Sequence, residues 1–163
     1  MITNRPRRLI GVPYVGYQRY FITICTALRR PLFVSPTVVD DLLLILRNTC
    51  EMFEFAITAY CFMPDHAHAL LTANSERSDL RECVRRFKQV SAFQHKRRLQ
   101  QRLWQPGYHD RILRDDEGTE AVIRYVMENP IRAGLTQAIG EYPFAGSDVY
   151  DISALLTAWE GRT

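Results

Sequence analysis

Two histidines, His66 and His68, stand two positions apart between apolar segments. Residues 55–63 and 67–73 are rich in aromatic and branched residues and flank Pro64-Asp65, which predicts a β-hairpin with its turn at this dipeptide. Side chains two apart on a strand share a face, so the imidazoles project together from Cα atoms roughly 7 Å apart. Such a pair can bind one metal ion. The alternative is two buried histidines, each of which would cost roughly 1–3 kcal/mol without partners.

Tyr125 and Asn129 are four positions apart in a segment whose apolar spacing predicts a helix. Residues four apart share one helical face, so a hydroxyl and an amide could both reach the same ion or phosphate. A tyrosine at the edge of the core is the alternative reading. The helix is expected to end at Glu128, because the residue before Pro130 is pushed out of the α region.

Cations dominate the stretch between residues 75 and 114, although the whole chain carries a net charge of only +3. Residues 79–98 are expected to form a helix that has no acidic residue after Glu82. Solvated helices usually carry both signs, so this outer face favours contact with a polyanion. The candidate contacts on it are Arg81, Arg85, Arg86, Lys88, Lys96, Arg97 and Arg98. Arg5, Arg7 and Arg8 lie in residues 1–16, an extended arm that is either disordered or in contact with phosphates.

The chain has 163 residues, of which 47% are hydrophobic and 24% charged, and this predicts one domain with a full core. Its four cysteines form no Cys-x-x-Cys pair and are expected to be small buried hydrophobes. A zinc site of Cys61, His66 and His68 would fit no standard spacing. With no signal peptide and no run of about 18 apolar residues, we expect a cytoplasmic protein without membrane contact.

The remaining elements frame these residues. Residues 17–26 are dense in β-formers and predict a central strand, and 108–114 predict a further strand. Ser35-Pro36 predicts a helix start, with a capping hydroxyl and a helix that runs to about residue 51. Residues 142–144 (Tyr-Pro-Phe) should pack back on the body. The expected boundaries are a basic arm (1–16), a domain (17–150) and a tail (151–163) that could be helical.

Several motifs together resemble the single-tyrosine HUH transposases and, within them, the REP-associated tyrosine transposases of bacteria. Residues 63–68 (Met-Pro-Asp-His-Ala-His) resemble the family's proline-acidic-His-x-His hairpin, although alanine stands where a bulky apolar residue is usual. Residues 103–110 (Leu-Trp-Gln-Pro-Gly-Tyr-His-Asp) resemble its Trp-Gln motif, and Phe87-Lys88 lies where the family has its basic helix. Residues 124–134 (Arg-Tyr-Val-Met-Glu-Asn-Pro-Ile-Arg-Ala-Gly) resemble its nucleophile helix, and 142–144 its closing motif.

The resemblance implies an α+β, ferredoxin-like domain, with an antiparallel sheet and helices packed mainly on one face. It implies that Tyr125 is the nucleophile and that His66, His68 and Asn129 bind Mg²⁺ or Mn²⁺. The implied activity is cleavage and joining of single-stranded DNA at hairpins of palindromic repeats, through a 5′-phosphotyrosine, by a monomer or homodimer. Sequence choice would need base contacts beyond the phosphate contacts of the arginines.

Three alternatives remain open from the residues. Tyr108 is a rival nucleophile, because it adjoins His109 and Asp110 and an imidazole could act as a base. A non-catalytic module that binds hairpin DNA or RNA would use the basic helix and the arm but no metal. A metal hydrolase of the His-x-His barrel type would need a third histidine and a carboxylate that the hairpin does not offer.

Overall fold

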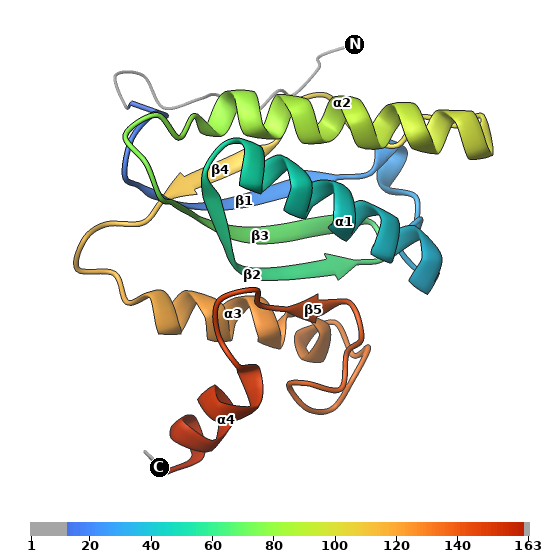
Figure 1. Cartoon of the computed structure of the whole chain (residues 1–163). Coiled ribbons are helices and arrows are strands. Elements are labelled where there is room, and N and C mark those ends of the chain that lie inside the picture. Colours follow the sequence, from blue (N-terminus) through green and yellow to red (C-terminus); the bar gives the residue numbers. More distant parts are fainter. Residues whose placement is uncertain (1–12, 162–163) are drawn as a thin grey trace.

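A five-stranded antiparallel sheet divides the protein into two layers of helices (Figure 1). The computed structural model describes residues 13–161. The strands follow the order β4-β1-β3-β2-β5 across the sheet, so β1 is an inner strand, as predicted. The elements are β1 (Arg19–Cys25), the 3₁₀ turn η1 (Ala27–Arg29), α1 (Pro36–Met52), β2 (Phe55–Met63), β3 (His66–Ala73), α2 (Leu80–Leu99), β4 (His109–Ile112), α3 (Thr119–Arg132), β5 (Ala145–Gly146) and α4 (Ile152–Glu160).

The helices lie on both faces of the sheet. Helices α1 and α2 cover one face, and α3 and α4 lie across the other (Figure 1). The predicted α+β fold with an antiparallel sheet is confirmed, but the helices do not pack mainly on one face. The physical reason is that the sheet is apolar on both sides. Alternate residues of β2 and β3 enter a second core, in which Ala59, Cys61, Met63 and Leu70 meet Val122, Ile123, Val126 and Met127 of α3.

The predicted hairpin is confirmed, and its register fixes which way the histidines point. Strands β2 and β3 pair with Met63 opposite His66 and Cys61 opposite His68. Ala67 and Ala69 of β3 belong to the core under α1 and α2. Because side chains alternate along a strand, His66 and His68 project from the opposite face, the one on which α3 packs.

Helix α3 continues past the predicted stop at Asn129-Pro130. It ends at Arg132, with Pro130 inside its last turn. Proline has no N–H to donate to the carbonyl of Val126, but the Asn129 side chain supplies a donor there, with Nδ2 3.4 Å from that oxygen. So close to the C-terminus the proline costs one backbone hydrogen bond, and the helix tolerates it.

The packed part of the chain starts before the predicted boundary at Tyr17. Tyr14 is buried and stacks on Tyr20 of β1, with ring centroids 6.3 Å apart, because its ring adds apolar area to the core under α2. The rest of the predicted arm, residues 1–12 with Arg5, Arg7 and Arg8, lies outside the described residues.

The C-terminal segment packs back on the sheet, as predicted. Tyr142 donates a hydrogen bond to the carbonyl of Phe62 at 2.8 Å, and Phe62 N–H donates to Phe144. The chain then forms α4 within the predicted tail. Of the helices within residues 13–161, none combines the length and the apolar character needed to cross a membrane.

The second core should be essential for seating α3. Leu70 of β3 is fully buried beneath that helix, whereas Leu44 on α1 is 57% exposed. We expect Leu70→Ala to lower the free energy of unfolding by about 2–5 kcal/mol, because it leaves a cavity. Leu44→Ala should change it by about 0.5 kcal/mol or less. Urea unfolding of both variants checks this, and equal losses would contradict the packing described.

Candidate functional site

His66 and His68 converge on one point. Their Nε2 atoms lie 3.0 Å apart, and the ring planes are nearly perpendicular. Their Nδ1 atoms point away to separate partners: His66 Nδ1 lies 2.6 Å from a carboxylate oxygen of Asp65, and His68 Nδ1 lies 2.9 Å from the hydroxyl of Thr23. Two nitrogens 3.0 Å apart can both bind one ion at the usual distance of about 2 Å.

The hydrogen bonds made by the Nδ1 atoms determine whether the Nε2 atoms carry a proton or a lone pair. A carboxylate only accepts, so Asp65 holds the proton of His66 on Nδ1 and leaves a lone pair on Nε2. The hydroxyl of Thr23 can accept the proton of His68 in the same way. With the His68 proton on Nδ1, two lone pairs converge on a point that a cation can occupy; with that proton on Nε2, His68 donates to His66 instead. Histidine ligands of metals are commonly oriented by a hydrogen bond of this kind to the ring nitrogen that does not bind the ion.

Electrostatics keeps His68 neutral and Asp65 charged. Burial lowers the pKa of His68 to about 3, and the charges of His66, Arg132 and Arg29 act in the same direction. Burial alone would raise the pKa of the Asp65 carboxyl, but the hydrogen bond with His66 and the charge of Arg29 outweigh it and hold that pKa below its usual value. Arg29 Nε lies 2.9 Å from Asp65 Oδ2. A neutral imidazole beside a supporting carboxylate is the state that metal binding requires.

Asn129 lies on α3 with its amide nitrogen turned to its own helix. Nδ2 is 3.2 Å from the backbone carbonyl oxygen of Tyr125, one turn earlier in the same helix. The amide nitrogen is engaged in this way, so the oxygen is the atom of Asn129 that could serve as a ligand. Within residues 13–161, no third His, Cys, Asp or Glu joins the histidine pair. A third protein ligand would therefore be an uncharged group, such as this amide.

Cys61 lies directly across the hairpin from His68 but does not suit the alternative zinc site. Its thiol is fully buried in the second core, and burial raises its pKa to about 12, although the charge of Arg132 opposes that rise. Zinc binds the thiolate form of cysteine. A thiol that stays protonated is a packing group. Cys50, Cys61 and Cys83 are buried, as predicted, whereas Cys25 is only partly buried and accepts a hydrogen bond from Arg29.

One aromatic ring, that of Phe21, lies between Tyr125 and His68. The Phe21 ring stacks on His68, with centroids 5.3 Å apart, and meets the Tyr125 ring edge to face at 5.9 Å. Tyr125 is 50% exposed. The structure thus brings an accessible phenol to the same side of the sheet as the two imidazoles.

Tyr108, the rival nucleophile, is placed differently. It is 7% exposed and belongs to the core under α1 and α2. His109 is exposed and pairs with Thr23 across β1 and β4, so it points to the other face. Adjacent residues on a strand point to opposite faces, so His109 does not lie beside the Tyr108 hydroxyl, and the burial of Tyr108 keeps it from a DNA phosphate.

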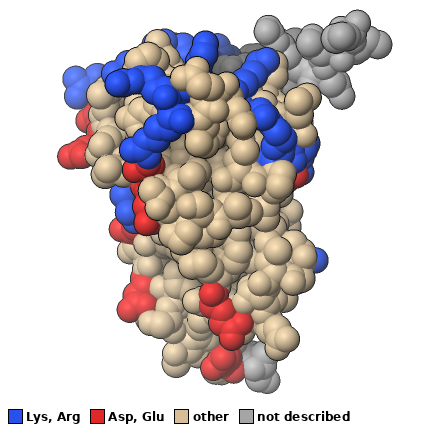
Figure 2. Space-filling model, turned by 90° about the vertical axis from the view of Figure 1, so that its right-hand side faces the viewer, with Lys and Arg blue, Asp and Glu red and all other residues tan. Residues whose placement is uncertain are grey.

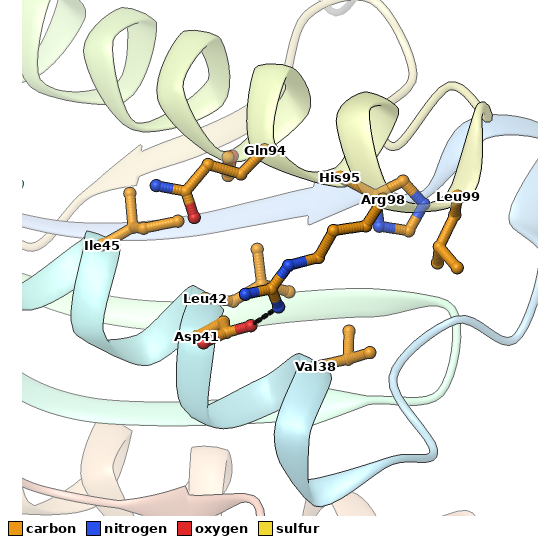
Figure 3. A pocket seen from close by; sticks show the side chains of 9 residues that line it. Val38, Asp41, Leu42, Ile45, Gln94, His95, Arg98 and Leu99 are labelled. Atoms are coloured by element: carbon orange, nitrogen blue, oxygen red, sulfur yellow. Dashed lines mark hydrogen bonds and ion pairs between the residues drawn. The ribbon is translucent and has the colours of Figure 1, made fainter.

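The cations predicted to form one basic face of α2 have different partners in the structure. Lys88 points inward and donates to the carbonyls of Gln105, at 2.8 Å, and Gly107, so it is not part of the outer face. Arg81 stacks on Tyr14, and Arg85 pairs with Glu82. Arg98 turns to Asp41 of α1 beside a cavity of about 40 Å³ between the helices (Figure 3).

The C-terminal end of α2 and the turn of the hairpin lie at the same end of the molecule, on the right of Figure 1. The loop after β1 joins them: Thr26 N–H donates to the carbonyl of Asp65, and Arg30 donates to Gln101 and to the carbonyl of Arg102. Figure 2 looks onto this end, where Lys and Arg gather at the top and acidic residues lie lower. We call this cluster the basic end surface: Arg29, Arg30, Lys96, Arg97, Arg98 and Arg102.

Sequence reasoning missed the partners of the predicted site. Thr23, Phe21 and Arg29 come from the first strand and its loop, more than thirty-five positions before the two histidines. Arg132 lies within the resembling segment, but its type alone gave no role. The register of β1 against β3, with Thr23 opposite His68, was the missing information.

Comparisons with known proteins identify relatives of this chain. The family described as "Transposase IS200 like" matches residues 15–129. A Haemophilus influenzae protein named for the REP-associated tyrosine transposases is 24% identical over 137 residues, which is 77% of each chain. The REP-associated tyrosine transposase of Escherichia coli is 25% identical over 91 residues, 56% of this chain and 53% of its own.

The solved structure of a REP-associated tyrosine transposase bound to a REP hairpin shares the fold. Its TM-score is 0.72 at 22% identity, and the match covers 93% of this chain and 96% of that one. The resemblance inferred from the sequence motifs is thereby confirmed. The matched residues include both histidines, Tyr125 and Asn129, and the chain belongs to the IS200-like family of transposases.

Proposed function

We propose that this protein is a metal-dependent endonuclease and strand transferase for single-stranded DNA, and that it acts beside DNA hairpins through a 5′-phosphotyrosine. One observation carries the proposal: the convergent pair His66 and His68 and the exposed Tyr125 share one face of the sheet, joined by Phe21. A binding module would need neither the paired imidazoles nor an accessible phenol beside them.

Tyr125 supplies the nucleophile. Its phenolic oxygen attacks the scissile phosphorus and loses its proton, the bond from phosphorus to the 3′ oxygen breaks, and that oxygen takes up a proton. The DNA 5′ end is then esterified to Tyr125, and the free 3′-hydroxyl can leave. Attack of another 3′-hydroxyl on the ester releases the tyrosine and joins the strands. The covalent bond stores the energy for joining, so no ATP is needed.

His66 and His68, with the amide oxygen of Asn129, would hold Mg²⁺ or Mn²⁺. When bound, the ion supplies a positive charge that polarises the phosphate and stabilises the charge of the transition state. Mixed nitrogen and oxygen ligands suit Mn²⁺ at least as well as Mg²⁺. Asp65 and Thr23 orient the imidazoles, and Arg29 holds Asp65 as a carboxylate.

The basic end surface is the proposed contact for the phosphates of a hairpin. A relative with the same fold is bound to a REP hairpin, and this surface adjoins the turn before His66, because Arg29 pairs with Asp65. Phosphate contacts position DNA without reading its sequence, so the surface would place the hairpin and leave the choice of bases to other groups. Arg81, Arg85 and Arg86 lie nearer the other end of α2 and would contribute less.

Removal of the Tyr125 hydroxyl should abolish covalent chemistry. With a labelled single-stranded oligonucleotide and Mn²⁺, the wild type should form a protein–DNA adduct and Tyr125→Phe should form none. Tyr17→Phe, which alters another exposed tyrosine, and Tyr108→Phe should retain the adduct. Gel electrophoresis followed by mass spectrometry locates the linkage. An adduct in Tyr125→Phe, or a linkage at Tyr108, would show that the nucleophile is assigned wrongly.

The carboxylate that orients His66 should influence the affinity for a metal ion. We expect His68→Ala to abolish Mn²⁺ binding and Asp65→Asn to weaken it about 10- to 100-fold, because the amide no longer fixes the proton of His66 on Nδ1. Paramagnetic resonance titration of free Mn²⁺ measures both without DNA. His109→Ala, an exposed histidine on the same face, is the control. Equal affinity of Asp65→Asn and wild type would remove the carboxylate from the site.

The basic end surface should account for salt-dependent binding. Lys96→Ala with Arg97→Ala is expected to weaken binding to all hairpins and to reduce the slope of log affinity against log salt by about 2. The matched control, Arg85→Ala with Arg86→Ala, removes the same charge from the same helix about 15 Å away. Its slope should change by less. A larger effect of the control pair would move the hairpin to the N-terminal half of α2.

A further inference from the structure

Arg132 contacts the proposed nucleophile at two points and Glu128 at a third. The carbon of its guanidinium lies 4.3 Å from the centroid of the Tyr125 ring. Its NH2 donates to the backbone carbonyl of Tyr125 at 2.7 Å, and its NH1 lies 3.3 Å from Oε2 of Glu128. The planar group is therefore laid over the phenol ring and fixed at both ends to the same helix.

A second arginine of α3 forms a matched arrangement away from the nucleophile. Arg124 Nε lies 2.8 Å from the other oxygen of Glu128, and its guanidinium lies over the ring of Trp159 at 5.5 Å. Glu128 thus holds two arginines, one over Tyr125 and one over α4. Both are partly exposed, and both pair four positions along the helix.

Arg132 lies on the same side of the sheet as the histidine pair. Its guanidinium lies over the Tyr125 ring, which meets the Phe21 ring edge to face, and Phe21 in turn stacks on His68.

We propose that Arg132 is the positioning residue for Tyr125: its guanidinium, anchored by Glu128 and by the Tyr125 carbonyl, holds the phenol ring toward the histidine pair. The inference rests on the proposed function. A half-exposed tyrosine otherwise samples several rotamers, and an attacking oxygen that is misplaced by about 1 Å can cost roughly 100-fold in rate.

The planar shape of the group is as important as its charge. A guanidinium can stack on an aromatic ring while its separate N–H groups bind two acceptors, whereas an ammonium is a compact point charge. Lysine at this position would keep the charge but lose the flat contact with the ring. The conservative substitution therefore separates positioning from simple attraction of DNA.

The kinetic test compares Arg132→Gln and Arg132→Lys with Arg124→Gln, which loses the same charge and the same partner, Glu128. Adduct formation is measured in single turnover with Mn²⁺ over a range of oligonucleotide concentrations. Arg132→Gln should lower the rate at saturation about 10- to 100-fold, with half-saturation unchanged within about twofold. Arg132→Lys should remain at least about 10-fold slow, and Arg124→Gln should match wild type. Full recovery in Arg132→Lys, or an effect confined to half-saturation, would overturn the proposal.

A structural test does not depend on activity. Fluorotyrosine placed at position 125 gives a ¹⁹F signal whose shift and width report the surroundings of the ring. Arg132→Gln should move this signal toward that of a free fluorotyrosine, and Arg124→Gln should leave it in place. An unmoved signal in Arg132→Gln would refute the contact. If the signal moves but the wild type forms no adduct, the contact stands and the proposed function fails.

Discussion

The two-residue period of β3 is the constraint on which the site depends. Ala67, Ala69 and Leu71 are buried beneath α1 and α2, and their burial fixes the register of the strand against β1 and β2. A shift by one residue would exchange the two faces, burying the imidazoles in that core and exposing the alanines to α3. Hydrophobic burial on one side of the sheet therefore holds the histidines on the other side.

Local sequence patterns are enough to predict the hairpin and the direction in which its histidines point. The hairpin, its turn and the shared face of His66 and His68 follow from alternation over a few residues, and the shared face of Tyr125 and Asn129 follows from helical spacing. The end of α3 could not be predicted in this way. Proline lacks a donor, but the Asn129 side chain supplies one to the carbonyl of Val126, and a local rule for proline does not include such a replacement.

Charges were harder to predict than periodicity. Lys88 was expected on the outer face of α2, but it reaches the carbonyls of the turn after Trp104, and Arg98 reaches Asp41 on another helix. The partner of a long charged side chain depends on which groups the tertiary structure places within its reach, and a local pattern does not contain this information. Conversely, Arg29 and Arg30 join the cations of α2 at one end, although more than sixty positions separate them in the chain.

The loop that carries these arginines is held in a costly conformation. Leu28 and Arg29 both have left-handed backbones, with φ of 57° and 55°, and Leu28 is 85% exposed. Such residues cost of order 1 kcal/mol each and persist only where the surroundings impose them. Here Thr26 is bonded to the carbonyl of Asp65, Ala27 to that of Leu103, and Phe33 to that of Pro64. The strained conformation lowers the stability of the loop, but it lets the loop close over the hairpin turn and brings Arg29 to the carboxylate that orients His66. The backbone strain therefore lies next to the candidate site, where the positions of the side chains matter most.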